Sequence, residues 1–364
     1  MSSELREKLL KIIVVLISTY LFLLGIKLLG HSFKLFGEGF AEAMLQMTSN
    51  PLAGLLMGIV ATSLIQSSST TTSIVVGLVA GDALTLPNAI PIVMGANIGT
   101  TITNTLVSLG HIANKVEFKR AFSASVVHDF FNICAVLLFF PLEMKFHFIQ
   151  KSAVILQEGF SVAGGMTFFN PLKFVLNPAI QFIDRLFENL PYASILLMIF
   201  SFILMFGALS YIIKTMRSLV LNKLEIIINS YLFKNDISGF VFGILMTIFV
   251  QSSSVTTSII IPLAGAGFVT VRQIFPYTLG ANIGTTVTAI LAALATQNVV
   301  AVTVAFSHLI FNIFGIVVFY PLRALPIFLS IFIAEKASAS TRSLLVIVVV
   351  YILLHFIPIA FLFF

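Results

Sequence analysis

The sequence predicts an all-α integral membrane protein built from two inverted-topology repeats. Of its 364 residues, 59% are hydrophobic and only 9% are charged, whereas soluble domains carry about 25% charged residues. Long apolar stretches recur along the chain, and the polar sequence Gln-Ser-Ser-Ser occurs twice within apolar surroundings. A soluble protein of this length needs a polar surface that these residues cannot supply. The composition therefore excludes the soluble classes.

Seven stretches are long enough to cross a bilayer as helices, which requires about 20 apolar residues. They cover residues 12–30, 89–110, 121–141, 193–211, 274–295, 299–320 and 344–364. The first span follows a charged N-terminus and no small-residue cleavage site comes after it, so we expect a retained anchor and not a signal peptide.

Two further apolar regions, residues 52–80 and 239–267, are interrupted by polar runs. The runs read QSSSTTTS at 66–73 and QSSSVTTS at 251–258. Each half of such a region is too short to cross alone. We therefore expect re-entrant helical hairpins whose turns are shielded from lipid.

The polar runs belong to a long internal duplication. A separation of 185 residues relates Gln66 to Gln251, and GANIGTT at 95–101 to GANIGTT at 280–286. Farther along, the separation falls to 180 residues and relates these pairs: His128 to His308, Asn132 to Asn312 and Pro141 to Pro321. The second GANIGTT span is the third crossing after the first, so the copies point in opposite directions, as in secondary transporters. Glycine beside asparagine also predicts that each GANIGTT span is partly unwound.

These patterns divide the chain into four parts. We expect the first inverted repeat at 1–145, an external loop with amphipathic segments at 146–190, the second repeat at 191–322, and a C-terminal interfacial segment with the last span at 323–364. Basic residues concentrate on cytoplasmic flanks, so Arg6 and Lys11 predict a cytoplasmic N-terminus. The net charge of +6 fits this orientation, and we do not expect nucleic acid as a partner.

Clusters of polar side chains inside spans indicate function, because such groups are expensive in lipid. Hydroxyls and backbone N–H groups at helix N-termini bind oxyanions, whereas amide and carbonyl oxygens bind a hard cation such as sodium. Ser and Thr also serve to cap carbonyls or to let helices pack closely. The repetition of both motifs in both copies favours ligand binding.

Asp129 is a carboxylate inside a span and needs a cation or a proton. Its counterpart in the second copy is Leu309, so we expect an additional cation site in the first copy only. His128 and His308 are expected to pack against neighbouring helices, although a proton relay through His128 and Asp129 is an alternative. No metalloprotease, nucleophile-elbow or Walker A motif occurs in the sequence, so we expect a transporter and not an enzyme.

Several of these motifs together resemble the type II sodium–phosphate cotransporter family, in particular its bacterial members. They are QSSSTTTSIVV at 66–76, GANIGTTITNT at 95–105, EFKRAF and VVHDFFN within 117–132, QSSSVTTS at 251–258 and LGANIGTTVTAILAALA at 279–295. The resemblance covers residues 25–322. It implies sodium-driven import of inorganic phosphate by alternating access across the plasma membrane (the inner membrane in a Gram-negative cell). Sodium is the coupling ion, and no cofactor is expected.

The motifs and the resemblance together assign the site residues. The expected phosphate ligands are Ser67, Ser68, Ser69, Ser252, Ser253, Ser254, Asn97 and Asn282. The expected sodium ligands are Gln66, Thr100, Asp129, Gln251, Ser252, Thr285 and Thr288. Asp129 matches the aspartate of electrogenic members, which implies electrogenic transport of divalent phosphate. Ser123 and Ser125, however, stand where electrogenic animal relatives have alanine.

Neither polar run and neither GANIGTT segment contains Lys or Arg. We therefore expect sodium to bind first and to supply the positive field that admits phosphate. Three alternatives remain at this point: a carrier of another oxyanion (sulfate, arsenate or a dicarboxylate), a non-transporting phosphate sensor, and an intramembrane hydrolase built on the serines and His128.

Overall fold

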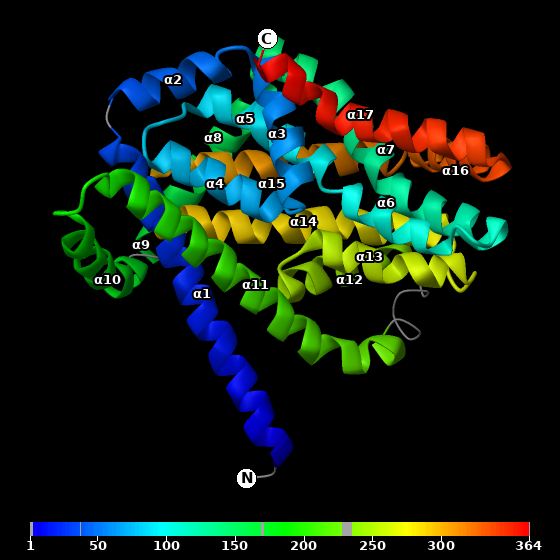
Figure 1. Cartoon of the computed structure of the whole chain (residues 1–364), viewed down its shortest axis with the longest axis horizontal. Helices are drawn as coiled ribbons and strands as arrows, with labels where there is room; N and C mark the ends of the chain where they lie inside the picture. Colours follow the sequence, from blue (N-terminus) through cyan, green and yellow to red (C-terminus); the bar gives the residue numbers. More distant parts are fainter. Residues whose placement is uncertain (1–2, 37, 169–170, 228–234, 364) are drawn as a thin grey trace.

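The computed structural model describes residues 3–36, 38–168, 171–227 and 235–363. Within these ranges the chain is helical and contains no strand (Figure 1). The helices of the first part are α1 (Ser3–Leu35), α2 (Glu38–Thr48), α3 (Pro51–Ile65), α4 (Ser68–Ala80), α5 (Leu86–Gly99), α6 (Ile102–Ser108), the 3₁₀ turn η1 (Leu109–His111), α7 (Lys115–Phe146), α8 (Phe148–Val162), α9 (Gly165–Phe168) and α10 (Pro171–Phe187). Those of the second part are α11 (Ala193–Ile227), α12 (Asp236–Val250), α13 (Ser253–Gly265), α14 (Val271–Thr296), α15 (Val299–Phe319), α16 (Ala324–Ala339) and α17 (Thr341–Phe363).

In the described part of the chain, six helices are long and apolar enough to cross a membrane, which confirms the prediction of an all-α, multi-pass membrane protein. They are Leu5–Leu35, Leu86–His111, Lys115–Phe146, Ala193–Ile212, Val271–Thr296 and Val299–Phe319. Each of them overlaps a predicted span. The seventh predicted span, residues 344–364, falls on α17. The side chains described for that helix end at His355, so this crossing stays a prediction.

Both interrupted regions form two short helices that meet at a Gln-Ser turn. The pairs are α3 with α4 and α12 with α13. The first arm of each pair contacts the next long helix, α5 or α14, far more extensively than it contacts its own second arm. The arms therefore diverge from the turn and do not lie along each other as a closed hairpin (Figure 1).

Glycines let the first arms approach their long helices closely. A Cβ atom at Gly95 of α5 would lie 2.0 Å from the carbonyl oxygen of Leu55, and one at Gly280 of α14 would lie 2.0 Å from that of Phe240. Neither position can therefore hold a side chain without moving a backbone. These glycines serve helix packing.

The two GANIGTT spans differ in continuity. In the first copy α5 ends at Gly99 and α6 begins at Ile102, but Thr100 and Thr101 between them keep right-handed helical dihedral angles, so unwinding stays a prediction there. In the second copy α14 is a continuous helix through residues 280–286, so the prediction is wrong there. Glycine beside asparagine does not by itself break a helix, because Gly280 is used for close packing on α12, as Gly95 is on α3.

The two copies share one core. Its largest cluster joins α1, α4, α11, α14 and α15 through buried side chains that include Ile26, Val76, Met205, Ala292 and Val304. α14 and α15 run through the middle of the molecule (Figure 1). In a membrane such contacts contribute packing energy and not removal from water. This common core sets the positions of the two Gln-Ser turns.

Candidate functional site

The two Gln-Ser turns have nearly the same backbone conformation. Gln66 ends α3 and Gln251 ends α12, each in the left-handed region with φ 58°. Ser67 and Ser252 follow in extended conformation, and each side chain accepts a backbone N–H from the first turn of the next helix. The left-handed conformation costs about 1–2 kcal/mol for a residue other than glycine. The surrounding packing must offset this strain, which is a feature of functional turns.

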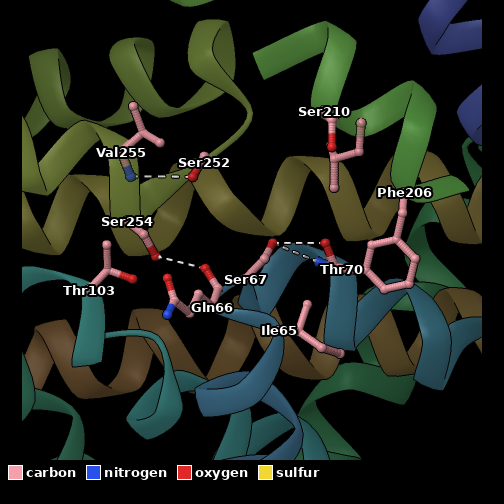
Figure 2. Close-up of a pocket in the computed structure, with 11 residues that line it drawn as sticks. Ile65, Gln66, Ser67, Thr70, Thr103, Phe206, Ser210, Ser252, Ser254 and Val255 are labelled. Atoms are coloured by element: carbon pink, nitrogen blue, oxygen red, sulfur yellow. Dashed lines mark hydrogen bonds between the residues drawn. The ribbon is translucent and has the colours of Figure 1, made fainter. Parts of the chain in front are cut away.

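The turns meet across a cavity of about 230 Å³ (Figure 2). Ser254 Oγ, from the second copy, lies 3.3 Å from the carbonyl oxygen of Gln66 and 3.2 Å from that of Thr100 and donates to these acceptors. The cavity is lined by Ile65, Gln66, Ser67, Thr70, Thr103, Phe206, Leu209, Ser210, Ser252, Ser254 and Val255. None of these described lining residues is charged.

Two helices begin at this cavity, α4 and α13. The first N–H groups of a helix have no acceptor within it and carry the positive end of the helix dipole. The Oγ atom of Ser67 accepts from the N–H of Thr70 at 3.2 Å and from its hydroxyl at 2.9 Å. The hydroxyl proton of Ser67 is thus left to donate. Hydrogen-bond donors from two helix N-termini, in a cavity whose described lining carries no charge, suit an oxyanion.

The structure separates the predicted phosphate ligands into groups. Ser67, Ser252 and Ser254 line the cavity. Ser68 and Ser253 are buried residues in the first turns of α4 and α13, where their backbone N–H groups belong to the free donors. Ser69 occupies the same first turn of α4 and is also buried.

Asn97 and Asn282 do not line the cavity, because their side chains lie in a buried hydrogen-bond network. His308 Nε2 lies 2.8 Å from Asn97 Oδ1, and His128 Nε2 lies 2.6 Å from Asn282 Oδ1. Each copy's histidine thus holds the asparagine of the other copy. Each asparagine also donates its Nδ2 to an asparagine of the other copy at 2.8 Å. Asn97 donates to Asn312 Oδ1 on α15, and Asn282 donates to Asn132 Oδ1 on α7. In this conformation both amides are already engaged and face protein groups.

This network also gives the tautomer of the histidines. An asparagine Oδ1 only accepts, so Nε2 carries the proton in both His128 and His308. The Nδ1 atoms of both rings are buried without a hydrogen-bond partner. His128, considered above as the base of a hydrolase, contacts an asparagine and not a serine hydroxyl.

Two of the predicted sodium ligands of the second copy lie together. Thr288 Oγ1 donates to Gln251 Oε1 at 2.7 Å. Both residues line a second cavity of about 240 Å³, bounded also by α1 and α11. Thr285 lies one turn earlier on α14 and donates to the carbonyl oxygen of Ala281 at 2.9 Å.

The corresponding residues of the first copy are arranged differently. Gln66 lines the turn cavity, and Thr100 Oγ1 donates to the carbonyl oxygen of Ala96 in α5 at 2.9 Å. Thr103 stands 185 residues before Thr288. Its buried hydroxyl has no hydrogen-bond partner, and the residue lines the turn cavity.

Asp129 lies apart from both cavities. Its carboxylate is 3% exposed and accepts from the hydroxyl of Tyr351, which is 3.3 Å from each oxygen. In the described part of the chain, no three His, Cys, Asp or Glu side chains cluster as metal ligands. A cation at Asp129 would thus depend on hydroxyl and carbonyl oxygens for its other ligands.

Sequence reasoning missed seven residues that line the turn cavity: Ile65, Thr70, Thr103, Phe206, Leu209, Ser210 and Val255. Thr70 and Val255 belong to the polar runs, and the repeat relates Thr103 to Thr288, so these three had a signal. Phe206, Leu209 and Ser210 lie on α11, which packs along α1. Ser210 is one of three serines in the apolar span 193–211, and nothing local marks it or its neighbours.

Known proteins similar to this chain agree on one kind of protein. Residues 21–168 and 203–355 match the family model described as Na+/Pi-cotransporter. The chain is 32% identical over 395 residues to sodium-dependent phosphate transport protein 2A of Rattus norvegicus, covering 88% of this chain and 62% of that protein. It is 31% identical over 406 residues to sodium-dependent phosphate transport protein 2B of Homo sapiens, covering 86% and 59%. The chain thus spans about three fifths of these relatives' length. No solved structure matches it.

Proposed function

Because this chain belongs to the Na+/Pi-cotransporter family, we propose that it is a sodium-coupled secondary transporter that imports inorganic phosphate by alternating access. One observation carries the proposal. Two turns from the two copies meet at one cavity that receives two helix N-termini and has no charged residue among its described lining. The relatives' names supply the ions, sodium and phosphate.

Phosphate binds in this proposal between the turns. The hydroxyls of Ser67, Ser252 and Ser254 donate to its oxygens, together with the first N–H groups of α4 and α13. Neutral donors at helix starts bind oxyanions well. They do not neutralise the two negative charges of divalent phosphate, which is the form we propose as substrate.

Sodium supplies the missing positive charge. The second-copy site is built from Gln251, Ser252, Thr285 and Thr288, of which Gln251 and Thr288 are already in contact. In the first copy Gln66 and Thr100 provide oxygens beside Ser254. Sodium binds first, and its field then admits phosphate.

Alternating access is proposed because the two turns belong to different copies and touch each other at one cavity. The two copies are proposed to be inverted repeats, and the arms of each turn diverge instead of packing on each other. The turns touch across the copies through the hydroxyl of Ser254. A movement of one turn relative to the other would open the cavity to one side and close it to the other.

Uptake of labelled phosphate into proteoliposomes tests this proposal. We expect uptake in sodium but not in choline medium, and competition with sulfate and arsenate measures selectivity. Ser254→Ala should raise the KM for phosphate by about tenfold, because it removes a hydroxyl from the cavity. Ser73→Ala is the control, because its hydroxyl bonds within α4, to Ser69. Equal uptake in choline, or an unchanged KM in Ser254→Ala, would refute the site.

Transport is proposed to be electrogenic, with a further sodium ion bound at Asp129. The motivating observation is a buried carboxylate with only a tyrosine hydroxyl as its described partner. Asp129→Gly should retain uptake and lose net current. Unchanged current per phosphate would remove Asp129 from the cation sites.

A further inference from the structure

A basic pocket of about 520 Å³ lies at the far end of α13 from the turn cavity. It is lined by Lys119, Arg120 and Ser123 of α7, Gly267 of the loop after α13, and Thr270 and Arg272 at the start of α14. Because α13 has 13 residues, the pocket is about 20 Å from the turn. It is therefore a separate place from the proposed transport site.

The positive charge of this pocket comes from both copies. Lys119 donates to Glu335 at 2.6 Å, so its charge is partly offset. Arg120 and Arg272 remain, and Arg272 is attracted to Asp236, which itself bonds to Arg323. Guanidinium groups present planar forks that match the oxygens of a phosphate.

Uncharged donors line the same pocket. Ser123 is buried, with 3% of its surface exposed, and its hydroxyl has no hydrogen-bond partner. The N-terminus of α14 also opens here. Its capping box uses the N–H groups of Thr270 and Gln273, which leaves the first N–H groups of the helix available. A buried hydroxyl without a partner costs free energy unless a ligand satisfies it.

The loop after α13 is shaped to admit Arg120. Gly267 has φ +86°, and a Cβ atom on it would lie 2.6 Å from Arg120 Nη1. Glycine favours this conformation and also leaves the space that the guanidinium occupies. Arg120 of α7 is thus seated against the loop of the other copy.

The duplication does not by itself produce this pocket. At the positions that match Lys119 and Arg120 the other end of the fold has Val299 and Val300, and at the position that matches Arg272 it has Pro87. Basic residues placed only for orientation in the membrane need not converge on a buried hydroxyl and a helix N-terminus. Here they do.

We propose that this pocket is a second anion site, which binds a phosphate group carried either by inorganic phosphate or by the headgroup of an anionic phospholipid. It does not depend on the proposed transport function, because no residue is shared with the turn cavity. Two guanidiniums, the hydroxyl of Ser123 and the start of α14 hold the phosphate oxygens. The apolar side chains of Ile327 and Ile331 on α16 complete the wall.

Binding to the full-length purified protein tests the proposal, in choline buffer without sodium, where the proposed transport site has lost its coupling ion. One arm titrates inorganic phosphate by calorimetry. The other compares phosphatidylglycerol with phosphatidylcholine by native mass spectrometry. Arg120→Gln/Arg272→Gln should weaken binding by about tenfold or more, whereas Lys115→Gln/Lys145→Gln, with the same charge change on exposed parts of α7, should not.

Ser123→Ala is a second variant that keeps every charge, and it should weaken binding by about two- to tenfold. Arginine-dependent binding of inorganic phosphate identifies the free ion as ligand, and arginine-dependent binding of phosphatidylglycerol identifies the lipid. If neither ligand's binding depends on the arginines and Ser123 more than on the control lysines, the proposal is overturned. Ser254→Ala should leave this binding unchanged. Failure of the second-site proposal can therefore be distinguished from failure of the transport proposal.

Discussion

The two Gln-Ser turns have the same backbone but different side-chain contacts. Gln66 and Gln251 both have φ 58°, with ψ 29° and 25°. The amide of Gln251 is engaged, because it accepts from Thr288 at 2.7 Å and donates to the carbonyl of Ile248. Gln66 instead lines the turn cavity, and Thr103, the counterpart of Thr288, has a buried hydroxyl without a partner.

This difference follows the continuity of the long helices. α14 is unbroken, so Thr288 lies along it within reach of Gln251. In the first copy α5 ends at Gly99, and Thr103 lies on the separate short helix α6. The motif thus determines the shape of the turn, whereas the next helix determines whether its glutamine is engaged.

At the centre of the molecule, by contrast, both copies make the same histidine–asparagine contact. His128 holds Asn282 and His308 holds Asn97, at 2.6 and 2.8 Å. All four side chains are at most 4% exposed. The asymmetry at the turns therefore arises around a buried centre in which both copies make the same histidine–asparagine contact.

The largest expected effect comes from breaking that centre. Asn97→Ala and Asn282→Ala should each lower the free energy of unfolding by about 3 kcal/mol, because each leaves two buried partners unsatisfied. The two losses should be equal within about 0.5 kcal/mol. Unfolding in mixed micelles, followed by circular dichroism, measures both.

Asn88→Ala is the control for this pair, since Asn88 is only partly buried and donates a single bond to Thr48 at 3.1 Å. It should cost about 1 kcal/mol or less. A large difference between the Asn97 and Asn282 variants would show that the two equivalent contacts do not contribute equally to the free energy of unfolding.

An intermediate effect is expected at the threonines beside the turns. Thr288→Val should cost about 1–2 kcal/mol, because it leaves Gln251 Oε1 without its donor. It should also weaken the sodium dependence of uptake. Thr103→Val, the matched change in the other copy, should alter the free energy of unfolding by less than about 0.5 kcal/mol, since its hydroxyl has no partner to lose. Equal costs for the two variants would contradict the difference between the turns.

Much of this architecture was accessible from local sequence. The spans and the breaks at Gln66-Ser67 and Gln251-Ser252 follow from segment length and from polar residues in apolar surroundings. The continuity of α14 was not accessible, because the same GANIGTT residues lie within one helix in the second copy and extend past the end of α5 in the first.

The site shows the same division between local and tertiary information. The serines of the two Gln-Ser turns stand out in the sequence, as does Asp129. The contact of Asp129 with Tyr351 bridges 222 residues, and the contact of Ser254 with Gln66 bridges 188. Such contacts exist only once α17 and the two turns are placed by the shared core, and no periodicity reports them.

The smallest expected effect concerns how the first arms begin. α12 starts at Asp236, outside the six spans, where Arg323 and Tyr320 bond to its carboxylate. The corresponding first residue of α3 is Pro51, which has no charge. The Arg323 guanidinium lowers the pKa of Asp236 below its usual value of 3.8. Asp236→Asn should therefore cost no more than about 1 kcal/mol at pH 7, because the pair is partly exposed and screened.

The sign of the pH dependence follows from the lowered pKa. The contribution of Asp236 is fully present above the unfolded-state pKa near 3.8 and is lost as pH falls through the lower folded-state pKa. The melting temperatures of wild type and Asp236→Asn should thus differ at pH 5–8 and converge below about pH 3.8. Asp82→Asn, which removes the far more exposed partner of Lys34, is the control and should show a smaller difference. A gap between wild type and Asp236→Asn that widened with acidity would mean that the carboxylate destabilises the start of α12, and that this first arm needs no ion pair to begin where it does.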